Sequence, residues 1–254
     1  MFGRGKSSVN LKDDTKSTIA TVAALGAVSS RVARLGWRVL GPRCLHCGDR
    51  GGRVPVDLCE ACLTVLPWQL EPVAAGALAP FEYRDSVARD LRALKFGGDL
   101  RPAAIYGTLL AATVARQLLP AAWPALLIPI PLHPTRRAER GFNQAARIAY
   151  ELGRQLRIPV RDDLMQRTRA TSPQTDLPAD RRRANVAGAF AMQEDRSKIC
   201  ASLRDRAVAL VDDVSTTGST LAAAEQALRA IGVGTVQRWA VARTMPTNTT
   251  RPTY

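Results

Sequence analysis

At 254 residues, of which 46% are hydrophobic, the chain is long enough to hold one large domain or two small ones around a proper core. Its 36 basic and 22 acidic residues give a formal net charge of +14, which favours phosphorylated ligands, nucleic acid, or both. The longest apolar run, 19–28, is far shorter than the roughly 20 residues of a membrane-spanning helix. Asp13 and Asp14 interrupt the basic start that a secretory signal needs. We therefore expect no membrane span and a cytoplasmic location.

We expect residues 1–40 to form a tail followed by a helix, and residues 41–70 to form a small module around four cysteines. These are spaced C-x₂-C-x₁₁-C-x₂-C, at Cys44, Cys47, Cys59 and Cys62. Two close pairs of thiolates suit tetrahedral zinc, because each pair lies on a tight turn that aims both sulfurs at one point. A redox pair or a disulfide framework is the alternative. We favour structural zinc, with His46 a bystander rather than a ligand.

The rest of the chain, 71–254, is predicted to form one α/β domain. We expect a strand at 78–83, helices at 85–96 and about 102–118, a buried strand at 125–130, and a helix ending near Leu156. The segment LKFGGD places Lys95 at a helix end that we expect to be solvated, with a phosphate contact as the alternative. Three prolines, at 129, 131 and 134, predict a rigid loop at the carboxyl edge of the sheet, where open α/β sheets bind ligands.

Residues 167–190 are predicted to form a long polar connection. A loop of that length inside a compact domain is usually functional or disordered. It contains five arginines, at positions 167, 169, 181, 182 and 183, so a basic surface linker is the alternative interpretation. Residues 192–203 are interpreted as a solvated excursion, in which Cys200 is a plain side chain.

The most informative stretch is VALVDDVSTTGST, from Val208 to Thr220. Its apolar start predicts a buried parallel strand, and an alanine-rich helix is expected from Leu221 to about Ile231. Between them, Asp212 and Asp213 precede a hydroxyl-rich turn with one glycine. The unpaired N–H groups at the start of a helix, together with the helix dipole, favour an anion there. The acids, which only accept hydrogen bonds when ionised, suit sugar hydroxyls or magnesium rather than phosphate.

This stretch resembles the phosphoribosyl-pyrophosphate motif of the type I phosphoribosyltransferases. The resemblance implies an α/β fold with a mostly parallel sheet flanked by helices. It also implies that the catalytic acids Asp212 and Asp213 hold the ribose hydroxyls, and that magnesium accompanies the pyrophosphate. The 5′-phosphate would be bound by the following loop, Val214, Ser215, Thr216, Thr217, Gly218, Ser219 and Thr220.

A second resemblance covers about residues 42–244. PIPLHPTRRAERGFNQ, together with the cysteines, LKFGGD, RTRATSPQTDLPADRRRANVAGAF and a closing strand TVQRWAVART, is similar to the ComF family of competence-associated, phosphoribosyltransferase-like proteins. The family pattern implies a pyrophosphate loop of Pro131, Leu132, His133, Arg136 and Arg140. It implies a flexible loop that contains Thr171, Gln174, Arg182 and Asn185. Ala138 departs from the pattern, since a further basic residue is frequent there.

Two functions remain open at this point. The first is phosphoribosyl transfer in nucleotide metabolism, with phosphoribosyl pyrophosphate or a nucleotide as ligand. The second is a non-catalytic protein that binds single-stranded DNA during uptake, with proteins of the competence machinery as partners. The arginines suit DNA, but the interleaved aromatic residues of a stacking platform are missing from the sequence pattern. No stretch indicates which acceptor a transferase would use.

Overall fold

The computed structural model describes residues 17, 18, 20, 21, 43–49, 56–69, 77–169, 188–192, 203 and 206–245. The four described residues of the predicted N-terminal helix are helical, and the rest of that prediction lies outside the described residues. In the part of the chain that is described, no helix is both long and apolar enough to cross a membrane.

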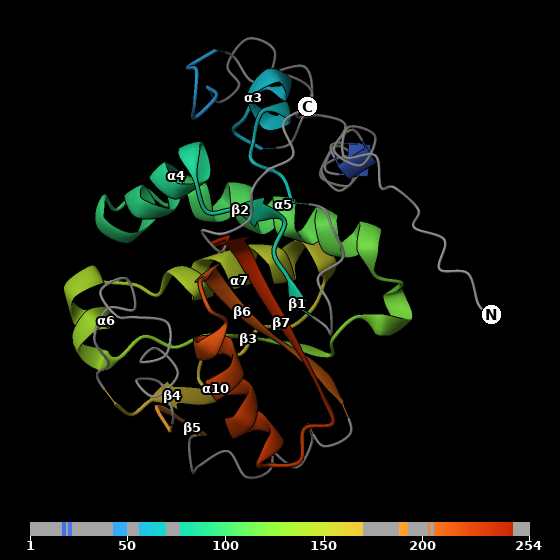
Figure 1. Ribbon diagram of the computed structural model, residues 1–254, viewed down its shortest axis with the longest axis vertical. Helices are drawn as coiled ribbons and strands as arrows, with labels where there is room; N and C mark the ends of the chain where they lie inside the picture. The colour runs from blue at the N-terminus through green and yellow to red at the C-terminus, as the bar shows by residue number, and fades with distance from the viewer. Residues whose placement is uncertain are drawn as a thin grey trace.

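A parallel sheet forms the centre of the molecule (Figure 1). Its strand order is β1 (Ala77–Leu78), β7 (Thr235–Arg243), β6 (Ala207–Ser215) and β3 (Leu126–Pro129), and β2 (Phe81–Glu82) also pairs with β7. Every pairing in this sheet is parallel. A separate two-stranded antiparallel sheet consists of β4 (Met165–Arg167) and β5 (Phe190–Met192). The carboxyl ends of β3 and β6 therefore lie side by side at one edge.

Helices cover both faces of the parallel sheet (Figure 1). On one face lie α5 (Arg101–Gln117) and α7 (Gln144–Leu156), with α4 (Asp85–Phe96) against α5. On the other lies α10 (Ser219–Arg229), together with β4 and β5. The predicted fold class, a mostly parallel sheet flanked by helices with a four-cysteine module in front, is confirmed.

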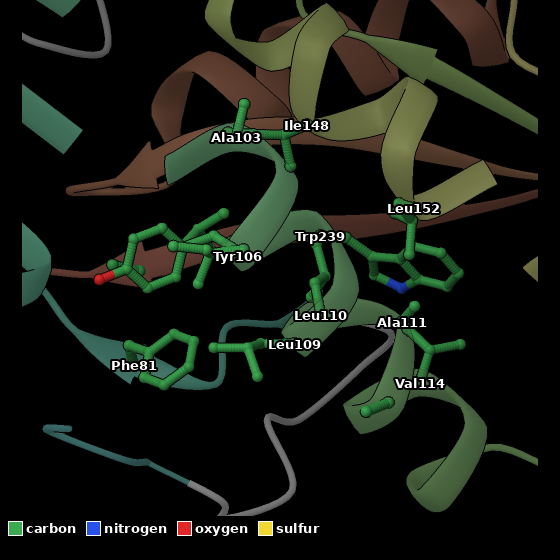
Figure 2. Packing of buried hydrophobic residues seen from close by; sticks show 14 of the residues in the cluster. Phe81, Ala103, Tyr106, Leu109, Leu110, Ala111, Val114, Ile148, Leu152 and Trp239 are labelled. Carbon is green, nitrogen blue, oxygen red and sulfur yellow. The ribbon is translucent and has the colours of Figure 1, made fainter. Parts of the chain in front are cut away.

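Two hydrophobic clusters follow from the alternation of side chains along the central strands. Ala209 and Val211 of β6 face α5 and α7, whereas Val208 and Leu210 face α10. Figure 2 shows Trp239 of β7 in the first cluster, which also contains buried residues of the cysteine module such as Leu58 and Leu63. The module, in which α3 spans Glu60–Thr64, thus shares one core with the α/β domain, while the predicted domain boundaries stay a prediction.

The backbones of α5 and α7 approach closely because Gly107 has no side chain. A Cβ at this position would meet the Glu151 side chain at 2.7 Å and the Ile148 carbonyl oxygen at 2.9 Å. Real Cβ atoms do not approach other atoms so closely, so any larger residue would push the helices apart.

Most predicted elements are observed within a few residues of their expected bounds. The predicted strand 78–83 is two short strands, β1 and β2, because Pro80 interrupts it. Among the elements that were not expected are helix α6 (Pro134–Arg140) inside the basic cluster, and strands β4 and β5. The helix predicted from Leu221 begins at Ser219, so two hydroxyl residues of the loop belong to its first turn.

Candidate functional site

The predicted pyrophosphate loop and the acid pair lie next to each other, because β3 and β6 end side by side. The backbone N–H of Ile130 donates to the Val211 carbonyl at 2.8 Å, one residue before Asp212. Asn143 connects this loop to α7. Its side-chain nitrogen donates to the Ile130 carbonyl at 3.0 Å. Its side-chain oxygen accepts from the Ala145 backbone N–H and so caps α7. These bonds hold the start of the loop against the end of β6.

Within this loop, His133 has a structural contact. Its Nδ1 atom accepts from the Thr135 backbone N–H at 3.4 Å and so caps α6. Pro134 occupies the first position of the helix, where its missing N–H costs nothing.

The two acids point to opposite faces of the sheet, as neighbours on a strand do. Asp213 is buried, and its Oδ2 atom lies 2.5 Å from the Nζ atom of Lys95 on α4. Burial alone would lower the pKa of Lys95, but the charge of Asp213, the hydrogen bond to Asp213 and the charge of Asp212 together outweigh burial and raise that pKa. Lys95 was predicted to lie at a solvated helix end; the structure instead gives it a side chain that is only 21% exposed. That prediction was wrong.

The position of Lys95 can be read from helical spacing. Leu91 and Leu94 of α4 are buried, and Lys95 follows Leu91 by four residues, which puts both on the same face of the helix. The long apolar stem of the lysine follows this face and carries its ammonium group to the edge of the sheet.

Asp212 is half-buried and accepts a hydrogen bond from the backbone N–H of Asp213 at 2.9 Å. Burial and the neighbouring Asp213 charge raise the pKa of Asp212 to about 8, although Lys95 counteracts them. Two carboxylates this close do not ionise independently. A ligand with hydroxyls or a cation at this point would favour the charged form of Asp212.

Three arginines form a cluster near the acid pair: Arg140 lies close enough to interact with Asp213, and Arg167 with Asp212. Arg136 and Arg140 stand four residues apart on α6, so they lie on the same face of that helix, and both are half-buried, whereas Arg137 is exposed. Arg167 comes from β4. Burial, and next the positive charge of Arg136, lower the pKa of both Arg140 and Arg167. Since guanidinium groups stay protonated in proteins, the cluster is an electrostatically favourable place for an anion.

The hydroxyl loop lines a cavity of about 550 Å³. Ser215, Thr216, Thr217 and Gly218 face it, together with Arg238 and Arg243 of β7. Gly218 has a left-handed φ of 73° and precedes α10 without a side chain to cap it. The first turn of α10 thus begins at an open cavity, which is the arrangement expected for an anion site. The acids and the predicted pyrophosphate loop are not among the residues that line this cavity.

The four cysteines come together as the spacing predicts. Their sulfur atoms lie within 4.8 Å of one another, and those of Cys47 and Cys59 are 3.7 Å apart. Tetrahedral zinc with sulfur ligands at about 2.3 Å requires a sulfur separation of roughly 3.8 Å. Burial opposes ionisation of Cys44, but backbone N–H groups outweigh it and lower the pKa of this thiol to about 6. Four free thiols in this arrangement could hold a metal ion.

His46, between the first two cysteines, reaches away from the sulfurs. Its Nε2 atom lies 2.7 Å from Oδ2 of Asp90 on α4, and both side chains are less than 10% exposed. The Tyr106 hydroxyl donates to the same carboxylate oxygen at 2.8 Å. His46 therefore joins the cysteine module to α4 and α5, a contact that the sequence did not indicate.

The predicted flexible-loop residues Thr171, Gln174, Arg182 and Asn185 lie outside the described residues, as does Cys200. The loop is bounded by β4 and β5, which pair antiparallel from Met165↔Met192 to Arg167↔Phe190. This pairing brings the two ends of the segment together next to the arginine cluster.

No family model matches the chain. It is 40% identical over 120 residues to Competence protein F of Haemophilus influenzae, a match that covers 47% of this chain and about half, 51%, of that protein. It is 33% identical over 190 residues to DNA utilization protein YhgH of Escherichia coli O157:H7, covering 74% and 78% of the two chains. Among solved structures, purine phosphoribosyltransferase from Pyrococcus horikoshii Ot3 is 18% identical with a TM-score of 0.30, over 55% of this chain and 80% of that one. At that level a structural likeness carries no functional information. The YhgH match, by contrast, extends over most of both chains, and the chain belongs to the ComF family.

Proposed function

We propose that this protein binds phosphoribosyl pyrophosphate with magnesium and transfers the phosphoribosyl group in nucleotide metabolism. The observation that carries the proposal is the hydroxyl loop: Ser215 to Gly218 face an open cavity at the start of α10, whose N-cap residue, Gly218, has no capping side chain. A phosphate there would accept hydrogen bonds from backbone N–H groups and hydroxyls, in place of the long 3.4 Å bond that the Ser219 N–H donates to the Thr217 Oγ1 atom.

The chain offers a separate group for each part of the ligand. Asp212 and Asp213 would accept hydrogen bonds from the ribose hydroxyls, and the hydroxyl loop would bind the 5′-phosphate. Arg136 and Arg140, beside the Pro131–His133 loop, would stabilise the departing pyrophosphate, whose charge magnesium also neutralises when bound. In this proposal, the predicted flexible loop that contains Thr171, Gln174, Arg182 and Asn185 closes over the sugar and excludes water, which would otherwise capture the reacting carbon.

We further propose that the four cysteines bind zinc in a structural role. Four sulfurs complete a tetrahedral shell and leave no open position for a water molecule or a substrate. Free thiols in this number also fit a reducing compartment, which supports the cytoplasm as the location.

A second candidate function is the handling of single-stranded DNA during uptake. It is supported by the names of the relatives, a competence protein and DNA utilization proteins, and by the net charge of +14. In this case the protein would use the arginines to bind the phosphate backbone, and its partners would include proteins of the competence machinery.

The first test is ligand-induced stabilisation. Phosphoribosyl pyrophosphate with magnesium should raise the melting temperature, and the Asp212→Asn/Asp213→Asn variant should lose that increase. Release of pyrophosphate in the presence of a panel of nucleobases then tests turnover. If the ligand leaves the melting temperature of the wild-type protein unchanged at millimolar concentration, the proposal fails. DNA binding that falls steeply with salt and survives both substitutions would favour the second function.

A further inference from the structure

Phe96, the last residue of α4, exposes its aromatic ring to solvent. The residue is 74% exposed, whereas Phe81 and Phe190 are 0% and 7% exposed. Phe96 follows the exposed Arg92 by four positions, so it lies on the solvent-facing side of α4, where a polar residue is expected. A single exposed apolar residue is ordinary on a protein surface. The surroundings of this ring are what distinguish it.

The ring lies at the edge of the candidate site. Lys95, the preceding residue, contacts Asp213. The guanidinium carbon of Arg140 lies 5.1 Å from the centre of the Phe96 ring, within the range of a cation–π contact. Arg140 is itself held in place, because its Nη1 atom donates to Oε1 of Gln144 at 3.3 Å. An arginine of the predicted pyrophosphate loop therefore touches the exposed ring.

The sequence after the ring leaves it uncovered. Gly97 and Gly98 follow, and neither has a side chain that could fold over Phe96. Gly98 has a φ of +68°, a left-handed conformation that other residues adopt only with strain, so the short turn away from the helix depends on glycine.

From this arrangement we infer that Phe96 and Arg140 form a stacking site for a nucleobase. An exposed aromatic ring beside guanidinium and ammonium groups binds a base by stacking on its π face, while the cations bind the accompanying phosphates. The base comes either from a small acceptor molecule or from a single strand. The acceptor source rests on the proposed phosphoribosyl transfer, whereas stacking of a base from a strand does not.

The test uses the Phe96→Trp variant as a fluorescent reporter. This variant should emit more strongly than the wild-type protein because of its added tryptophan. A short oligothymidylate should quench this added emission, whereas an abasic strand of equal length should not. Adenine, with phosphoribosyl pyrophosphate and magnesium present, tests the small-molecule source in the same way. Phe96→Ala should weaken oligothymidylate binding roughly tenfold or more. The abasic strand should bind this variant and the wild type equally.

Tyr150→Ala is the matched control, since Tyr150 of α7 is an aromatic residue that is 48% exposed. This variant should bind the oligonucleotide like the wild-type protein. The inference is overturned if neither source quenches the added emission of Phe96→Trp, or if Phe96→Ala and the wild-type protein bind the quenching ligand equally. Failure of the proposed function gives a different result from failure of this inference. In that case phosphoribosyl pyrophosphate leaves the melting temperature of the wild-type protein unchanged, while oligothymidylate quenches the emission of Phe96→Trp.

Discussion

Replacing Lys95 by methionine should destabilise the fold, because it leaves Asp213 without its counterion. Both partners are largely buried, with side chains 21% and 11% exposed. Breaking a fully buried pair costs about 3–5 kcal/mol, and an exposed pair about 1 kcal/mol or less. For this partly buried pair we expect about 2–3 kcal/mol. In a chain of this size, that corresponds to a fall in melting temperature of roughly 4–12 °C.

The loss should grow with pH. Lys95 lowers the pKa of Asp212, so removing the lysine raises the pKa of Asp212 in the folded state still further. A carboxyl whose pKa is higher in the folded than in the unfolded state makes stability fall as pH rises between the two values. The difference between Lys95→Met and wild type should therefore be larger at about pH 8 than at about pH 5.

The assay is thermal unfolding of four proteins at both pH values: wild type, Lys95→Met, Asp213→Asn and the double variant. Because the double variant removes both charges, it should recover most of the stability, with a coupling energy of about 1–3 kcal/mol. Equal melting temperatures for Lys95→Met and wild type at the higher pH would refute the reasoning. So would a double variant in which the two losses simply add.

Three further predictions concern the rest of the chain. Stripping bound metal with a chelator should lower the melting temperature, because the cysteine module shares its core with α4 and α5; metal analysis that finds no zinc in the purified protein would contradict this. Asp90→Ala removes the acceptor shared by His46 and Tyr106 and should cost about 1–3 kcal/mol in denaturant unfolding. Gly218→Ala should lower the free energy of unfolding by about 1–2 kcal/mol, because the backbone at this position is left-handed. Among the described residues, only the Ser215 hydroxyl comes within 4 Å of the added Cβ, so crowding adds little. A variant as stable as the wild-type protein would exclude this backbone strain.

The regular elements could be predicted because their patterns are local. The apolar run of β6 and the face of α4 formed by Val87, Leu91 and Leu94 determine strand and helix within a few residues. Helix α6 was missed because its sequence, PTRRAER, has no apolar face. Its start depends on Pro134 and on the cap that His133 provides, and both were interpreted as parts of a rigid loop.

The candidate site was predictable in its motifs but not in its contacts. Asp212, Asp213 and the hydroxyl loop are contiguous in sequence, and the structure gives that loop a cavity. Lys95, in contrast, lies 118 positions before Asp213, and Asp90 lies 44 positions after His46. Such pairs depend on how α4 packs against the sheet and the module, and a single sequence contains no signal for that packing.

Helix α4 links the cysteine module to the acid pair. Asp90 and Lys95 belong to the same helix, about 7.5 Å apart along its axis at about 1.5 Å per residue. Asp90 contacts His46, which lies between two of the cysteines, and Lys95 contacts Asp213 at the edge of the sheet. Because the buried face of α4 is packed between these contacts, the helix cannot rotate or slide at one end without disturbing the other. The module therefore helps to hold Lys95, the counterion of Asp213, in place. For this reason a structural metal bound by the cysteines would affect the acid pair, although the metal does not contact the acids.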